Sequence, residues 1–131
     1  MKKKIVIITV CLVAAVALFF GGSVLYNMSK YKKAVAESEI RTPDLSLIQD
    51  GVYNGTFDAF LVYADVDVSV YGHRITGITI NEHKNGRGAG AEVIIDEVLS
   101  KQSLEVDAIT GATNSSKVIL KAIEDALKKQ E

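Results

Sequence analysis

The fold is decided by the twelve residues FLVYADVDVSVY, positions 60–71. Apolar side chains alternate there with a more polar set, a period of two residues that is typical of a strand with one buried face. The apolar set is Phe60, Val62, Ala64, Val66, Val68 and Val70, and the second set is Leu61, Tyr63, Asp65, Asp67, Ser69 and Tyr71. We therefore predict a strand over 60–71 whose first set is buried.

Shorter strands are predicted on either side of this one. Residues 51–57 read as a first strand in which Asn54-Gly55 indicates a bulge or a bend. Gly72-His73 predicts a turn into a third strand over 74–82. Three strands with such short connections predict an antiparallel meander, and its apolar face needs a cover.

Two amphipathic helices can supply that cover. One is predicted over 91–101 and the other over 115–129, each with apolar side chains at helical spacing and charged side chains opposite them. The fold class is therefore α+β, with a small antiparallel sheet covered by two helices.

An apolar run precedes this domain. Residues 5–25 carry no charge over 21 positions, about 31 Å of helix, which matches the bilayer core. A cleaved signal peptide has a shorter apolar region and a small-x-small site, which we do not find here. We predict a cytoplasmic tail over 1–4, a transmembrane signal anchor over 5–26, a linker over 27–48 and a domain over 49–131. The linker is expected to be helical over 31–39 and extended around Thr42-Pro43.

Charge differs between the two parts of the chain. Residues 1–48 carry seven Lys or Arg and three acids, whereas residues 49–131 carry eight Lys or Arg and thirteen acids. Nucleic acid is a poor partner for so acidic a domain. The positive charges before the apolar run nearly equal those after it, so charge alone does not decide the orientation of the helix. We prefer an anchor that delivers the domain outside the cytoplasm, because a four-residue tail supplies no cytoplasmic domain. One cysteine and two histidines predict no metal site.

The chemistry is predicted at the start of the last helix, in the segment DAITGATNSS, positions 107–116. Glycine and small residues allow a tight turn, and the first turn of a helix leaves N–H groups without helical partners. Together with the threonine and serine hydroxyls, these donors predict an anion site suited to phosphate. The alternative is that Thr113 or Asn114 only caps the helix.

The segment 50–129 resembles the FMN-binding domain found in the C subunit of sodium-pumping NADH:quinone reductase and in the G subunit of the related electron-transport complex. The resemblance rests on DGVYNG at 50–55, on Glu82-His83 before the glycine loop 86–90, and on 107–113 followed by Ser115-Ser116. This loop lacks the proline often found ahead of the family's glycines. The chain is also much shorter than the respiratory subunits, so membership of their complexes is not implied.

The resemblance implies that a flavin transferase joins FMN to Thr113 through a phosphoester and that the domain lies outside the cytoplasm. It implies further cofactor-binding residues around the flavin, namely Asp107, Thr110, Gly111, Ala112, Asn114, Ser115, Ser116, His83, Gly88 and Gly90. A covalent phosphate link tethers the flavin ring without altering its electronics, so tuning is left to nearby protein groups.

The expected function is electron transfer between a donor and an acceptor, either redox proteins or a quinone, at the membrane. No residue resembles a dedicated general base or nucleophile, so the chain is not expected to be an enzyme by itself. Two alternatives stay open: a module or reductase component that holds FMN reversibly, and a non-redox, membrane-tethered scaffold that binds another phosphate ligand. A dinucleotide-binding loop at 86–90 is disfavoured because the glycine spacing is wrong.

Overall fold

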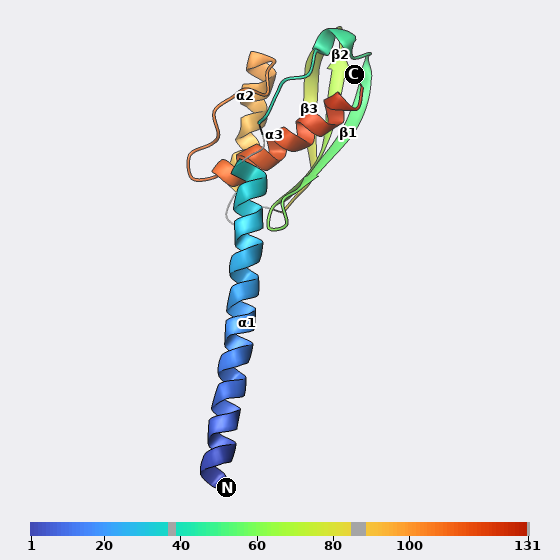
Figure 1. Cartoon of the computed structure of the whole chain (residues 1–131). Coiled ribbons are helices and arrows are strands. Elements are labelled where there is room, and N and C mark those ends of the chain that lie inside the picture. Colours follow the sequence, from blue (N-terminus) through green and yellow to red (C-terminus); the bar gives the residue numbers. More distant parts are fainter. Residues whose placement is uncertain (37–38, 85–88, 131) are drawn as a thin grey trace. The chain divides into compact units, whose positions relative to one another are not determined.

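The computed structural model describes residues 1–36, 39–84 and 89–130 and divides into two units, Met1–Ala34 and Val35–Glu131 (Figure 1). The second unit holds a three-stranded antiparallel sheet together with its helices. The predicted α+β class is therefore confirmed.

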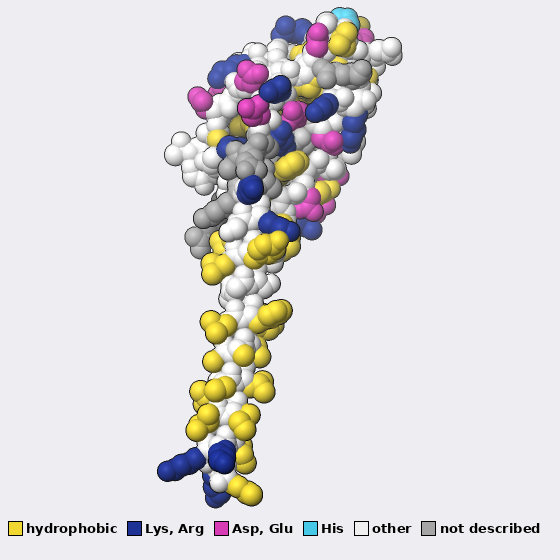
Figure 2. Space-filling view, viewed as in Figure 1, with side chains coloured by type: hydrophobic (Ala, Val, Ile, Leu, Met, Phe, Trp, Pro, Cys, Tyr) yellow, Lys and Arg dark blue, Asp and Glu magenta, His cyan; other side chains and the backbone are white. Residues whose placement is uncertain are grey.

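The first unit is built from helix α1, which runs without interruption over Lys2–Ala36. Its part Lys2–Lys30 is long and apolar enough to cross a membrane, by length and composition. Figure 2 shows hydrophobic side chains on the surface of this helix, and Leu18 and Phe19 are each more than three-quarters exposed. The helix continues past residue 26, the predicted end of the transmembrane segment. It includes residues 31–36 of the linker segment 31–39 that was expected to be helical, and Glu37 and Ser38 lie outside the described residues.

The sheet has the order β1-β2-β3, formed by β1 (Gly51–Asp58), β2 (Tyr63–Tyr71) and β3 (Arg74–Lys84). The alternation in β2 is confirmed from Ala64 to Val70, where every second side chain is buried. The prediction was wrong for Phe60, which is 71% exposed and belongs to the turn before β2. Its backbone φ of +70° takes it out of the strand, so the alternation does not continue through it.

No bulge or bend interrupts β1 at Asn54-Gly55, contrary to the prediction. Asn54 pairs with Asp67 and Gly55 with Val66 in an unbroken register. The glycine has a different purpose, because a Cβ built on Gly55 would lie 2.1 Å from the carbonyl oxygen of Ala122 and 2.4 Å from the amide nitrogen of Ala126. Because Gly55 has no side chain, the backbone of the last helix can pack directly against the backbone of the strand.

Helices cover the buried face of the sheet. Helix α3 (Thr113–Lys128) packs on β1 and β2, as Figure 1 shows, and α2 (Ile94–Lys101) packs beside β3. A short 3-10 helix, η2 (Ala89–Val93), comes before α2 and contacts α3. Compared with the predicted bounds, α2 begins three residues later and α3 two residues earlier.

The end of the expected linker belongs to the folded unit. Pro43 is buried, Ile48 is fully buried, and the 3-10 helix η1 (Leu45–Leu47) lies between them. The Nζ of Lys121 on α3 donates to the carbonyl oxygen of Glu39 at 2.6 Å. We call residues 39–48 the strap, since this segment is fastened to the domain.

The opposite face of the sheet is open and polar. The Asn54 side-chain amide donates to the carboxylates of Asp65 at 2.7 Å and of Asp67 at 2.9 Å. The hydrogen bond from Asn54, followed by the interaction with Asn81, lowers the pKa of Asp67 below its usual value. Two neighbouring acids on one strand are thus held by amide donors from the adjacent strands.

Candidate flavin site

A tight turn comes immediately before α3. The amide of Ala112 donates to the carbonyl oxygen of Ile109 at 2.9 Å and closes the turn around Thr110 and Gly111. Gly111 has a φ of +81°, which glycine adopts without the steric cost of a side chain. A Cβ built there would meet nothing within 4 Å, so the outer side of the turn is open space.

Ser116 holds this turn against the helix. Its hydroxyl accepts a hydrogen bond from the Ile109 amide at 3.0 Å and donates one to the Ala112 carbonyl oxygen at 2.8 Å. The residue is fully buried. Ser116 was predicted among the cofactor-binding residues, and the structure gives its hydroxyl two bonds within the turn. The same hydroxyl therefore shapes the turn that presents the neighbouring groups.

The exposed groups at the helix start are those of Thr113 and Asn114, whereas Ser115 is buried. The capping alternative is wrong, because the N-cap residue is Ala112 and no side-chain cap hydrogen bond is present. The first turn of α3 also contains no acid. The first turn of α3 therefore places the exposed Thr113 side chain beside the positive end of the helix dipole and beside amides that have no partner within the helix, an arrangement that favours an anion.

The loop that leads to this turn is anchored at its beginning. Gln102 lies in the left-handed region at the end of α2, and its side-chain amide donates to the Ile75 carbonyl oxygen while its amide oxygen accepts from the Ile75 N–H, both at 2.8 Å. Two residues on, the Leu104 amide donates to the hydroxyl of Thr42 on the strap at 2.9 Å. The loop is therefore fastened to the edge of β3 and to the strap.

A hollow of about 550 Å³ opens beside this loop. Asp107 and Thr110 both line it, together with Glu97 and Lys101 from α2, whose charged groups lie 3.0 Å apart. The structure thus brings two of the predicted site residues to one surface. It adds Glu97 and Lys101, which the sequence analysis missed because an ion pair one helical turn apart is an ordinary feature of an exposed helix.

His83 lies on β3, and its side chain is only 2% exposed. Its Nδ1 lies 3.0 Å from the Glu92 carboxylate on η2, so the pair joins the two segments that flank the glycine loop. Gly90 is exposed, with nothing within 4 Å of a Cβ built on it. Gly88 lies outside the described residues, as do the other residues from 85 to 88. The 3-10 helix η2, which contains Gly90, contacts α3.

Metal ligands are not assembled in the part of the chain that the structure describes. No group of three or more His, Cys, Asp or Glu side chains is placed there to hold a metal ion.

Comparison with protein families identifies the class to which this fold and site belong. The model of the FMN-binding domain family matches residues 62–128, which is more than half of the chain. No curated protein and no solved structure matches the chain. The chain belongs to the FMN-binding domain family, and FMN is its cofactor. The match begins one residue before β2, so β1 and the strap lie outside it.

The described residues fit an FMN phosphate at the start of α3. Thr113 and Asn114 are exposed on the first turn of α3, and a Cβ built on the preceding Gly111 would meet nothing within 4 Å. This combination suits a phosphoryl group, which needs several hydrogen-bond donors and a close backbone approach.

Proposed function

We propose that this chain is a membrane-anchored electron carrier whose FMN is attached to Thr113 through a phosphoester, with the domain outside the cytoplasm. The observation that carries the proposal is the exposure of Thr113 on the first turn of α3, in a chain that belongs to the FMN-binding domain family. When bound, FMN supplies one- and two-electron transfer through its ring.

Each part of the site has a distinct task in this proposal. Thr113 provides the oxygen that bonds to phosphorus, and the amides of the first helical turn neutralise the phosphate charge. Gly111 admits the phosphate close to the backbone, and Ser116 holds the turn in shape through its bonds to Ile109 and Ala112. Asp107 and Thr110 lie on the accessible surface of the hollow, where a flavin transferase can reach them.

Attachment requires an activated flavin donor, because a free phosphate monoester lacks a good leaving group. In the transfer, the Thr113 oxygen bonds to the phosphorus of the FMN unit while the phosphoanhydride bond of a flavin dinucleotide breaks. Nucleoside monophosphate leaves, and the hydroxyl proton passes to a base of the transferase. The resulting link keeps flavin on the protein even where free FMN is far below its dissociation constant, as outside a cell.

The deciding experiment compares Thr113→Ala with Thr113→Ser after co-expression with a flavin transferase. We expect the wild-type chain and the Ser variant to give a fluorescent band on a denaturing gel and a mass increase of one FMN less water, and the Ala variant to give neither. Lys117→Ala is the control, since it alters the same helix, keeps the Thr113 hydroxyl and lies outside the predicted cofactor-binding residues.

Other outcomes contradict the proposal in different ways. Fluorescence that persists in the Ala variant rules out Thr113 as the link. Flavin that is present in the native protein but lost on denaturation and filtration identifies a reversible FMN module. A colourless wild-type chain favours the scaffold that holds another phosphate ligand.

The location is tested separately. A cysteine placed at exposed Lys128, with Cys11 replaced, should react in intact cells with a membrane-impermeant thiol reagent if the domain lies outside. Labelling only after lysis would place the domain inside.

A further inference from the structure

The connection between β1 and β2 presents two apolar side chains to solvent. Its backbone is closed by a hydrogen bond from the Ala59 amide to the Val62 carbonyl oxygen at 2.9 Å, and the Phe60 amide donates to the Asp58 carboxylate at 2.7 Å. Ala59 and Val62 are buried, whereas Phe60 is 71% and Leu61 51% exposed. This turn therefore buries its two ends and exposes the two apolar side chains between them.

The exposure of Phe60 is built into the backbone. A φ of +70° is unfavourable for an L-residue and a clear outlier for a bulky one, whereas glycine adopts it freely. Single exposed apolar side chains are common and need no explanation. Here an aromatic residue occupies a position that favours glycine, beside a second exposed apolar residue.

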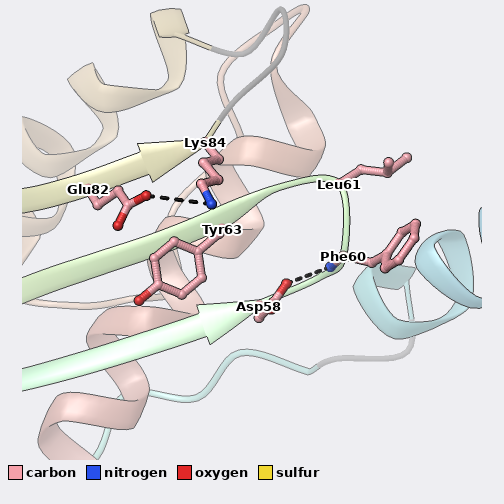
Figure 3. Close-up of a pocket in the computed structure, with 6 residues that line it drawn as sticks. All are labelled: Asp58, Phe60, Leu61, Tyr63, Glu82 and Lys84. Carbon is pink, nitrogen blue, oxygen red and sulfur yellow. Dashed lines mark hydrogen bonds and ion pairs between the residues drawn. The ribbon is translucent and has the colours of Figure 1, made fainter.

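Polar groups surround the base of this apolar tip, Phe60-Leu61. A hollow of about 240 Å³ lies behind it, lined by Asp58, Tyr63, Glu82 and Lys84 as well as by the tip itself (Figure 3). Figure 3 shows Phe60 and Leu61 pointing away from the polar side chains. The acids have local partners, since Asp58 accepts from the Phe60 amide and Glu82 lies 3.7 Å from the Lys84 ammonium.

An apolar tip with a tyrosine and a lysine at its base matches the change in polarity across a membrane surface. Apolar side chains favour the acyl boundary, tyrosine favours the headgroup level, and the aliphatic stem of a lysine lets its ammonium reach lipid phosphates. Tyr63 and Lys84 are these two residues, and the Lys84 ammonium lies 6.0 Å from the centre of the Tyr63 ring.

A bilayer is also the surface that stays within reach of the domain. Only residues 26–34 separate the apolar run ending at Leu25 from the folded unit beginning at Val35. As helix this segment spans roughly 14 Å, at about 1.5 Å per residue. So short a tether gives a high effective concentration of lipid, which makes even a weak contact populated. A protein partner would need about 800 Å² of matching surface, far more than a convex turn with two side chains offers.

We infer that Phe60 and Leu61 insert into the interface of the bilayer that holds α1, giving the domain a second membrane contact. The inference rests on the membrane anchoring proposed above but not on the flavin link. Two points of attachment restrict the rotation of the domain, and so limit which side of it a membrane-bound redox partner meets.

The chain contains no tryptophan, so Phe60→Trp introduces a single tryptophan at the tip, whose emission can be separated from that of the five tyrosines. The full-length variant is reconstituted into vesicles of phosphatidylcholine and phosphatidylglycerol, with or without brominated acyl chains. We expect brominated lipid to lower the emission of this tryptophan about twofold, because an interfacial side chain reaches about 5–10 Å into the headgroup and acyl boundary. Comparing matched vesicles cancels any quenching by bound flavin.

The matched control is Tyr71→Trp, an aromatic position with the same 71% exposure at the other end of β2. Tyr71 lies eight positions after Tyr63 along the strand, roughly 26 Å at about 3.3 Å per residue, so this tryptophan should not be quenched by lipid. Leu61→Trp serves as a second probe of the tip and should respond as the Phe60→Trp variant does.

Any of the following results would overturn the inference. Equal quenching at positions 60 and 71, or stronger quenching at 71, means that the tip is not the membrane contact. Blue-shifted but unquenched emission at both tip positions means that a protein, such as a second copy of the chain, covers the tip. A chain that fails to float with the vesicles contradicts the anchor itself, whereas a floating chain with an unquenched tip contradicts only this inference.

Discussion

Single residues decide how closely the layers of this domain approach. Gly55 lies where the backbone of α3 passes over β1, and Ser116 uses one hydroxyl to join Ile109 to Ala112 in the turn before Thr113. Neither residue is distinctive by type, since glycines and serines also occur in loops and on surfaces. Their importance follows from what lies within hydrogen-bond or contact distance.

We expect Gly55→Ala to destabilise the domain by about 1–3 kcal/mol or more, because overpacking against helix backbone cannot be relieved by a side-chain rotation. The new Cβ would lie 2.1 Å from the Ala122 carbonyl oxygen. The measurement is the free energy of unfolding from urea denaturation.

Gly77→Ala is the control for this change. The nearest atoms to its Cβ belong to Ser69, at 3.8 Å, which is ordinary contact distance. This variant should be neutral or slightly more stable, since alanine reduces the freedom of the unfolded chain. Equal losses at both glycines would show that β1 and α3 are not in backbone contact.

At the scale of elements, the strap and the loop before α3 are joined by polar bonds. Thr42 accepts the Leu104 amide at 2.9 Å, and its hydroxyl lies 3.1 Å from that of Ser103, which in turn accepts the Glu105 amide. The strap is outside the part matched by the family, yet it fastens the loop that carries Asp107 and Thr110. The loop before α3 therefore depends on a segment that precedes the sheet.

We expect Thr42→Val to cost about 1–3 kcal/mol of stability, because it leaves the partly buried Leu104 amide without its acceptor. Hydrogen exchange at that amide should accelerate, as measured by NMR. Thr42→Ser keeps the hydroxyl and should behave nearly as the wild type. If the Val and Ser variants exchange at the same rate, the bond between strap and loop does not hold the loop in place.

At the scale of the whole molecule, two units with different environments follow one another along the chain. Met1–Ala34 is a helix with exposed apolar side chains, whereas Val35–Glu131 has its own buried core of sheet and helices. A unit with its own core is expected to fold without its neighbour.

A chain that starts at Val35 should therefore keep the thermal midpoint of the full-length domain within a few degrees, a shift of under about 1 kcal/mol. It should also still accept FMN when incubated with purified transferase and flavin dinucleotide, and be recovered in the supernatant when membranes are sedimented. The measurements are thermal unfolding followed by circular dichroism, in-gel flavin fluorescence and fractionation. An unfolded truncated chain would show that the helix contributes to the fold.

The sequence by itself determined the features that repeat locally. The alternation in β2, the 21-residue uncharged run and the helical spacing in α2 and α3 are each visible within one segment, because strands and helices have fixed periods. The motif at 107–116, through its resemblance to a family, predicted FMN as the cofactor, which the family match supports.

Only the tertiary structure decided the features that join distant segments. Thr42 and Leu104 are 62 positions apart, and Gly55 meets Ala122 across an even longer interval, so no local pattern records either contact. Phe60 continued the period of β2 in the sequence but left the strand, because it lies with a positive φ inside the turn that the hydrogen bond from Ala59 to Val62 closes. Periodicity indicates which secondary structure a segment prefers. The closure of a turn and the close packing of a helix on a strand depend instead on the contacts that the segment makes with other parts of the chain.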